Sequence, residues 1–244
     1  MGILNNALTK EGKKIDKKHA EKETIKLKEA LYELQNLLFA GHKHSLLIIL
    51  QGSDASGKDG TVRHVFSSMN PMGVNVKAFK APTEEEMDHD FLWRVHPHVP
   101  AKGMIQIFNR SHYEDILVPT VHKTLSKERI ERRYEFINGF ENNLLENGTI
   151  VLKFFLHVSQ KEQTERIKER LTIADKNWKY DPADKREAPN WDKYEKVYEK
   201  IFERCGPKIP WIIVPADHKW YRNYFVAKTI VDTLKSLKME YPSR

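Results

Sequence analysis

The stretch LLIILQGSDASGKDGTV, residues 46–62, decides the fold of this chain. It opens with five consecutive apolar residues, and such a run without alternation is typical of a strand buried on both faces of a parallel sheet. A turn with the spacing G-x-x-x-x-G-K follows, from Gly52 to Lys58, and a helix is expected to begin near Lys58. A buried strand, a glycine-rich turn and a helix in this order predict a phosphate-binding loop.

This predicted loop offers an anion both backbone and side-chain contacts. Its glycines allow a tight turn whose N–H groups point inward, and the following helix adds the positive end of its dipole. Lys58 supplies a point charge to a transferring phosphoryl group. The residues expected to bind phosphate here are Gly52, Ala55, Ser56, Gly57, Asp59, Gly60 and Thr61.

One position departs from the usual loop. Asp59 follows Lys58, where a magnesium-binding serine or threonine normally stands, and it is interpreted as a favourable charge in the first helical turn. Thr61 carries a hydroxyl, but its spacing from Lys58 is wrong for the usual magnesium-binding residue. Asp54 inside the loop would repel an anion unless the two share a cation, so it is the candidate Mg²⁺ ligand. The alternative for Asp54 is an Asx-turn that shapes the loop.

Polar side chains also follow the third predicted strand, in the stretch NRSHYED. Because ligands of doubly wound sheets bind outside the carboxyl ends of the strands, four of these side chains should lie near the loop: Asn109, Arg110, Glu114 and Asp115. Arg110 suits a forked contact with phosphate. Glu114 or Asp115 would complete a magnesium site with Asp54. A structural salt bridge between Arg110 and one of these two acids is the competing interpretation.

Composition limits the class of protein. The chain has 244 residues, 40% of them hydrophobic, which suffices for one α/β domain. Its formal charge of +7 and pI of about 9.2 indicate an anionic partner: phosphate-rich small molecules, a phosphate polymer or nucleic acid. A single cysteine excludes an internal disulfide and suits a reducing compartment. Without a signal peptide or a run of about 18 apolar residues, we expect a cytoplasmic protein that does not bind membranes.

Strand candidates alternate with helical segments along the chain. Further apolar runs lie at 74–80, 103–109, 149–159 and 210–216 and share the pattern of a strand buried on both faces. Thr83 with Glu86 and Ser159 with Glu162 have the spacing of capping boxes, which start helices after the second and fourth strands. This alternation predicts a three-layer α/β/α fold around a mainly parallel sheet.

The remaining segments are assigned by composition and periodicity. Residues 1–22 form a basic stretch expected to be mobile, and residues 23–244 form a single domain that opens with a helix. An amphipathic helix is expected over residues 127–145. The charge-dense stretch at 160–205 is interpreted either as a solvated helical face or as a helical lid whose cations close over phosphate.

Four motifs carry a resemblance to one family. They are the loop G-x-D-A-S-G-K-D-G, the segment FNRSHYED, the stretch KNWKYDPAD followed by NWDKY, and the late PWIIVPADHKWYRN. In these motifs the chain resembles the family-2 polyphosphate kinases over most of its length. The resemblance implies a P-loop kinase fold with a helical lid and dependence on Mg²⁺, or on Mn²⁺ in its place. It also implies reversible phosphoryl transfer between inorganic polyphosphate and purine nucleotides.

The resemblance further implies roles for individual residues. Loops of this family carry no serine or threonine after the lysine and rely on the loop aspartate, which is Asp54 here. By the same match Lys58 and Arg110 contact phosphates, and Asp115 joins the metal site. The implied lid residues are Arg166 and Arg170, in the sequence ERIKER.

Two further properties rest on the resemblance. NRSHYED looks like the corresponding segment of family members that accept both nucleoside mono- and diphosphates, and Glu114 would bear on that range. Members assemble as dimers or tetramers, so a homodimer or homotetramer is expected.

Two other functions are compatible with single features of the sequence. The loop alone allows an ordinary nucleotide kinase that uses ATP as donor. The basic balance alone allows a nucleic-acid-binding ATPase, but such a protein should also gather exposed aromatic side chains among its cations. In transfer to a nucleotide's own phosphate the attacking oxygen is already anionic, so the reaction requires positive charge and positioning rather than a base. The lysine and arginine excess fits this requirement, and no nucleic-acid partner is expected.

Overall fold

The computed structural model describes residues 2–12, 15–178 and 182–243, so residues 179–181 of the predicted lid lie outside this part. Its centre is a five-stranded sheet in the order β2-β3-β1-β4-β5, and these strands all run parallel within the described residues. The strands are β1 (Ser45–Gln51), β2 (Val74–Ala78), β3 (Ile105–Asn109), β4 (Thr149–His157) and β5 (Trp211–Pro215). The predicted parallel α/β sheet is confirmed.

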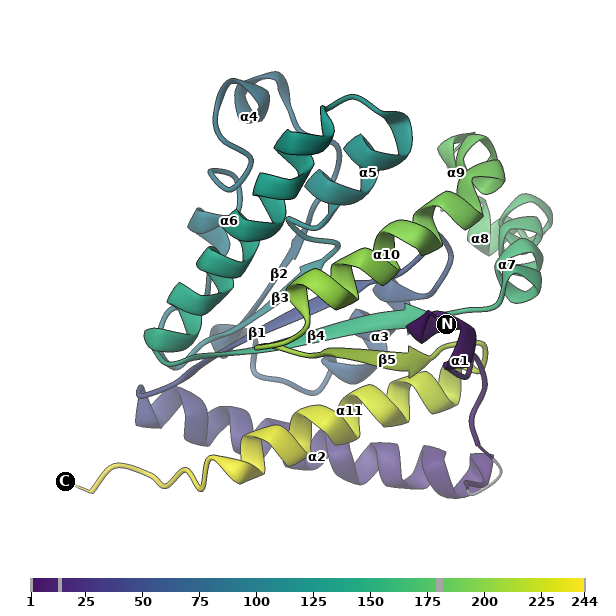
Figure 1. Cartoon of the computed structure of the whole chain (residues 1–244). Helices are drawn as coiled ribbons and strands as arrows, with labels where there is room; N and C mark the ends of the chain where they lie inside the picture. The colour runs from purple at the N-terminus through teal and green to yellow at the C-terminus, as the bar shows by residue number, and fades with distance from the viewer. Residues whose placement is uncertain (1, 13–14, 179–181, 244) are drawn as a thin grey trace.

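Helices cover both faces of this sheet (Figure 1). One face carries α2 (Lys17–Gly41), α3 (Lys58–Val65) and α11 (Lys219–Ser236). The other face carries α5 (Glu114–His122), α6 (Lys127–Glu146) and α10 (Trp191–Cys205). The remaining helices are α1 (Ile3–Asn6), α4 (Glu84–Asp88), α7 (Gln160–Thr172), α8 (Ala174–Asn177) and α9 (Pro182–Glu187). The sheet and the helices on its two faces form the three layers predicted from the alternation of strands and helices.

Strand β1 is buried on both faces, as its apolar run predicts. Leu47 and Ile49 belong to the core under α5, α6 and α10, whereas Leu46, Ile48 and Leu50 belong to the core against α2, α3 and α11. For the strand candidates at 74–80 and 210–216 the prediction of two-sided burial was wrong. Most residues of β2 and β5 are at least partly exposed, because each strand lies at an edge of the sheet with a neighbour on one side only.

Polar caps set the helix starts. Thr83 and Glu86 form the predicted capping box at α4, with both reciprocal hydrogen bonds. At α7, Ser159 accepts a hydrogen bond from the backbone N–H of Glu162 at 3.2 Å, which is one half of the predicted box. Ser126 caps α6, so the amphipathic helix predicted at 127–145 is confirmed almost to the residue.

The N-terminal segment lies against the domain. Asp16 caps α2, which therefore begins at Lys17 rather than near residue 23. Glu199 of α10 accepts hydrogen bonds from the backbone N–H groups of Ile3 at 2.7 Å and Leu4 at 2.6 Å, and the Leu4 side chain is buried. Mobility of residues 1–22 stays a prediction, which these contacts do not favour.

The predicted lid, residues 160–205, divides into two parts. Helix α10 packs into the core layer and buries Val197, Tyr198 and Ile201. Helices α7, α8 and α9 lie at the carboxyl end of the sheet, outside the two layers (Figure 1). The lid prediction therefore narrows to α7–α9, because α10 is anchored in the core.

A buried ion pair, which the sequence did not predict, lies beneath α6. Lys153 of β4 is fully buried and donates to the Glu141 carboxylate at 2.7 Å, to the Tyr113 hydroxyl at 3.0 Å and to the Cys205 carbonyl at 2.5 Å. Glu141 also accepts from the Tyr113 hydroxyl at 2.7 Å, and the His112 ring lies 3.3 Å from it. The network satisfies both charges, as a buried pair requires.

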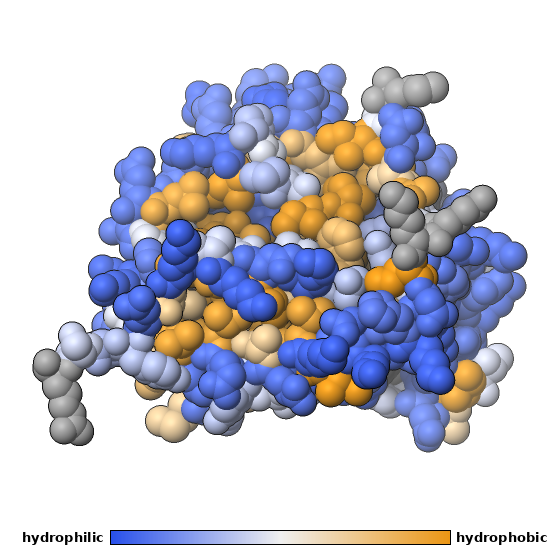
Figure 2. Space-filling model, turned by 90° about the horizontal axis from the view of Figure 1, so that it is seen from below, coloured by the Kyte–Doolittle hydropathy of each residue, from blue (hydrophilic) through white to orange (hydrophobic). Residues whose placement is uncertain are grey.

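The outer face of α2 and α11 carries apolar patches between charged side chains (Figure 2). Ile25, Tyr32 and Phe39 of α2 are seven residues apart and are exposed to 62%, 41% and 45%. This spacing places them along one side of the helix. In the described part of the chain, no helix is both long and apolar enough to cross a membrane.

Candidate active site

The glycine-rich turn joins β1 to α3, as predicted. Gly57 occupies the N-cap of α3 with φ of +102°, a left-handed conformation that side chains rarely adopt. Ala55 also has positive φ, at 59°, so the backbone turns tightly between Asp54 and Lys58. The turn brings the N-terminus of α3, with its free N–H groups, to the carboxyl end of the sheet, where an anion is favoured.

Lys58 is the first residue of α3, and its ammonium folds back over the loop. It donates to the Gly52 carbonyl at 2.8 Å and to the Ser53 carbonyl at 3.0 Å. An ammonium has three N–H donors, so these two bonds leave one for a ligand. Burial, aided by the positive charge of Arg110, lowers the pKa of Lys58 from 10.5 to about 8. A phosphate would restore the charged form.

Asp59, the residue that breaks the usual loop pattern, connects two strand ends. It lies in the first turn of α3, as predicted, and its carboxylate accepts from the Asn109 side-chain amide at 2.6 Å. Asn109 is the last residue of β3, so this bond ties the loop to the neighbouring strand. The Thr61 hydroxyl donates to the Gly57 carbonyl at 3.1 Å and is therefore engaged within α3.

Arg110 lies between two carboxylates at the end of β3. Its guanidinium donates to Asp54 at 2.5 Å and to Glu114 at 3.2 Å. The backbone of Arg110 has a positive φ of 60°. Glu114, acting against burial, raises the pKa of Arg110. The salt bridge between Arg110 and an acid, the competing interpretation of the sequence, is thus present together with the predicted approach to the loop.

Asp115 points to a different partner. Its carboxylate accepts from Arg94 at 3.0 Å, and Arg133 donates to its backbone carbonyl. Burial raises the pKa of Asp115, although Arg94 opposes the effect. Across the described residues no group of three or more His, Cys, Asp and Glu side chains could hold a metal ion. Asp54, with one bond from Arg110, still suits Mg²⁺ held by one carboxylate plus phosphate oxygens, whereas Asp115 would first have to lose Arg94.

Arg166 of α7 holds the back of the loop rather than facing its opening. Its N–H groups form five hydrogen bonds, as many as a guanidinium can donate. The acceptors are the Glu162 carboxylate and the carbonyls of Ala55, Ser56, Ala216 and Asp217, at 2.7–3.1 Å. A phosphate contact by Arg166 would require one of these bonds to break. Arg170, one turn further along α7, is half-buried.

Arg222 is a residue of this site that the sequence interpretation missed. It belongs to the motif PWIIVPADHKWYRN, but a single arginine in a polar helical turn normally indicates an exposed side chain. In the structure it is 1% exposed, and its guanidinium lies against Gly57 and Gly60. Arg94, which pairs with Asp115, was also missed, because its partner lies 21 residues further along the chain.

Two cavities meet beside the loop. A cavity of about 380 Å³ is lined by Gly52, Ser53 and Asp54 of the loop and by residues of α5, α7 and α10. A second, of about 760 Å³, lies between α4 and α5 and is lined by basic side chains that include Arg94 and Arg133. Arg110 and Glu114 line both cavities. The arrangement can hold two phosphate-bearing ligands with Arg110 between them.

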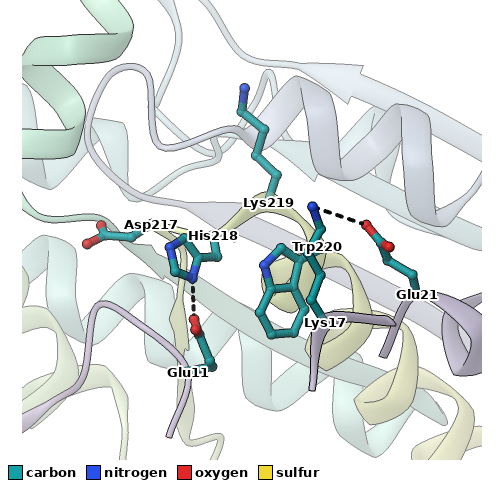
Figure 3. A pocket seen from close by; sticks show the side chains of 7 residues that line it. All are labelled: Glu11, Lys17, Glu21, Asp217, His218, Lys219 and Trp220. Atoms are coloured by element: carbon teal, nitrogen blue, oxygen red, sulfur yellow. Dashed lines mark hydrogen bonds and ion pairs between the residues drawn. The ribbon is translucent and has the colours of Figure 1, made fainter. Parts of the chain in front are cut away.

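A separate hollow of about 670 Å³ lies where the N-terminal segment crosses the start of α11 (Figure 3). His218 contacts Glu11 at 2.5 Å, and Trp220 lies beside this pair. Lys219 extends away from the Glu11–His218 pair (Figure 3). The contact between Glu11 and His218 thus joins the N-terminal segment to the start of α11. The residues that line the hollow include none of those predicted for phosphate binding.

The chain is similar to known proteins over most of its length. The model of the family polyphosphate kinase 2 (PPK2) matches residues 14–242. The chain is 46% identical over 217 residues to an AMP/ADP-polyphosphate phosphotransferase of Meiothermus ruber, covering 88% of this chain and 81% of that protein. It is 42% identical to an ADP-polyphosphate phosphotransferase of Rhodopseudomonas palustris, covering 88% and 78%. A crystal structure of polyphosphate kinase 2 from Arthrobacter aurescens superposes with a TM-score of 0.96 at 40% identity, covering 99% and 88%.

Proposed function

Since this chain belongs to the polyphosphate kinase 2 family, we propose that it transfers phosphoryl groups reversibly between inorganic polyphosphate and nucleotides. The observation that carries the proposal is the position of Arg110. It lies at the junction of two cavities, next to the loop that holds Lys58. Transfer between two anions needs positive charge at the point where they meet.

We assign the loop and the smaller cavity to the donor phosphates and the larger cavity to the acceptor nucleotide. A volume of about 760 Å³ is of the size that small-molecule ligands occupy. Arg133 lies over the ring of Phe91, at 4.7 Å from its centroid, and both line this cavity. An aromatic ring beside arginine side chains suits a ligand that has both a base and phosphates.

The site residues supply positioning and charge. Arg110 is balanced by Asp54 and Glu114 in the structure, so phosphate binding must compete with these carboxylates. We propose that Asp54 binds Mg²⁺, or Mn²⁺, together with phosphate oxygens; when bound, the metal neutralises phosphate charge. Arg110 would then be free to donate to the phosphoryl group as it moves between the two anions. We propose direct in-line displacement, because two cavities that meet at this side chain would bring the two anions together there.

Glu114 is placed to influence the choice of acceptor. It lines both cavities and holds Arg110 by a 3.2 Å bond. We propose that both AMP and ADP are accepted, because the relatives include enzymes named for AMP and for ADP. Guanine nucleotides are included in the proposal as further acceptors. Asp115 orients Arg94 toward the same cavity and would reach a metal only after that pair opened.

Self-association is also part of the proposal. The exposed apolar side chains on α2, defined by Ile25, Tyr32 and Phe39, offer a surface for a homodimer or homotetramer. No nucleic-acid partner is included in the proposal. Sedimentation of the purified protein at several concentrations tests the assembly.

The direct test combines the purified protein, magnesium and long-chain polyphosphate with AMP or ADP in separate reactions, followed by ion-exchange separation of the nucleotides. ADP or ATP should form without any added nucleoside triphosphate. If neither forms while ATP plus AMP still yields ADP, the protein is an ATP-dependent nucleotide kinase and the proposal is wrong.

A further inference from the structure

Arg222, in the first turn of α11, fills the space behind the phosphate-binding loop. A methyl group added at Gly57 would overlap its Nη1 atom, and one added at Gly60 would lie 3.2 Å from its Nη2 atom. Both glycines therefore leave room for the guanidinium. Its side chain is almost completely buried, at 1% exposure.

The hydrogen bonds of Arg222 leave its charge without a counter-charge. Nε and Nη2 donate to the Asn223 amide oxygen at 3.2 and 2.9 Å, and Nη1 lies 3.5 Å from the Ser56 carbonyl. Among the residues that the structure describes, no carboxylate forms an ion pair with it. Its charged neighbour is instead Arg166, whose Nη1 approaches the same Gly57 position at 3.7 Å.

Two buried guanidinium groups beneath one loop are unfavourable unless an anion is near. Burial and the charge of Arg166 lower the pKa of Arg222 to about 10, in agreement with this repulsion. Arg166 is fixed by five hydrogen bonds to five different acceptors, whereas Arg222 bonds the amide oxygen of the adjacent Asn223 and makes one long contact with the Ser56 carbonyl. Arg222 is therefore the member of the pair that structural bonding explains less well. Arg166 already has the Glu162 carboxylate as a counter-charge, so an anion on the other face of the Ser56–Gly57 backbone would compensate the charge of Arg222.

We propose that Arg222 is a positioning residue for the donor phosphate chain, acting through the loop backbone at Ser56 and Gly57 without contacting the substrate. The inference rests on the proposed function, in which polyphosphate occupies this loop. The uncompensated charge of Arg222 favours the anion-bound state and lowers the stability of the free enzyme. Removing the charge should therefore weaken donor binding without weakening the unliganded fold.

The test compares Arg222→Met, which keeps an unbranched apolar stem and removes the charge, with Arg222→Lys, which keeps the charge. The matched control is Arg204→Met, because Arg204 is an exposed arginine of α10 that pairs with Glu131. Binding of tripolyphosphate, and separately of ATP, is measured by calorimetry in magnesium buffer. Melting temperatures are recorded with and without each ligand, and steady-state kinetics give KM for polyphosphate and for AMP.

In Arg222→Met, the Kd for tripolyphosphate and the KM for polyphosphate should rise at least tenfold, with KM for AMP within twofold. Its melting temperature without ligand should equal or exceed that of the wild type, and Arg222→Lys should recover most of the affinity. Unchanged affinity in Arg222→Met overturns the inference. So does a lower melting temperature in both Arg222 variants without ligand, because Arg222 would then be a structural support.

The two ligands separate this inference from the proposed function. If the wild type binds ATP but not tripolyphosphate, the proposed function fails. The role of Arg222 is then decided by the Kd for ATP: a rise of at least tenfold in Arg222→Met supports the inference, and an unchanged Kd overturns it. Wild-type binding of neither ligand overturns both.

Discussion

The lowered pKa of Lys58 makes donor binding depend on pH in a direction that can be worked out. Its ammonium is buried and has a pKa of about 8 instead of 10.5. The difference corresponds to roughly 3 kcal/mol at about 1.4 kcal/mol per pH unit, which a bound phosphate can restore by stabilising the charged form. Binding therefore takes up a proton wherever the free enzyme has lost it.

The sign and size follow from the two protonation states. If the bound pKa returns to 10.5 or above, binding at pH 9 takes up about 0.9 proton, because the free lysine is then only about one-tenth charged. At pH 7 the uptake falls to about 0.1 proton, because the free lysine is already charged. The affinity for the donor phosphate is therefore highest below pH 8 and decreases nearly tenfold per pH unit above it.

Calorimetric titration of long-chain polyphosphate into the enzyme, in two buffers of different ionisation enthalpy, measures the proton uptake directly. The interior phosphates of a long chain do not titrate in this range, so the signal belongs to the protein. Lys58→Met should bind weakly and lose the pH-dependent uptake. Uptake near zero at pH 9 in the wild type, or equal uptake in Lys58→Met, would refute the assignment of Lys58 to phosphate binding.

Three other variants address the catalytic site and the supports around it. Asp54→Asn should lower kcat at least a hundredfold with an unchanged melting temperature, and retained turnover would contradict its role as the metal ligand. Arg166→Met removes hydrogen bonds to four carbonyls, so urea unfolding should show a loss of at least about 3 kcal/mol. Lys153→Met leaves Glu141 buried without a counter-charge and should cost about 3–5 kcal/mol, whereas the double variant with Glu141→Gln should recover part of this loss.

The local features of the fold could be predicted because they depend on neighbouring residues. The capping box at Thr83 and the cap at Ser126 involve residues three positions apart. The burial of β1 follows from an uninterrupted apolar run. The edge strands were judged too buried, because burial of a strand depends on its position in the sheet, and the strand order is not encoded in any one segment.

Site residues could be predicted where they lie in the loop itself or directly after the strand next to it. Asp54, Lys58 and Arg110 come together as expected, since β1 and β3 are adjacent and end at the same edge. The partner of Asp115 could not be predicted, because Arg94 lies 21 residues earlier and reaches it only through tertiary packing. Arg222 lies 165 residues beyond Gly57, the loop residue that it touches.

The sequence by itself therefore determined the class of fold, the phosphate-binding loop and the family, because strand burial, glycine conformations and motif spacing are properties of short segments. Only the tertiary structure decided which charges neutralise one another. In the tertiary structure Arg110 pairs with Asp54 and Glu114, and Asp115 pairs with Arg94. Arg166 donates hydrogen bonds to carbonyls of the loop. The physical reason is that the energy of a charge depends on burial and on partners within a few ångströms, and both are set by segments that are distant in the chain.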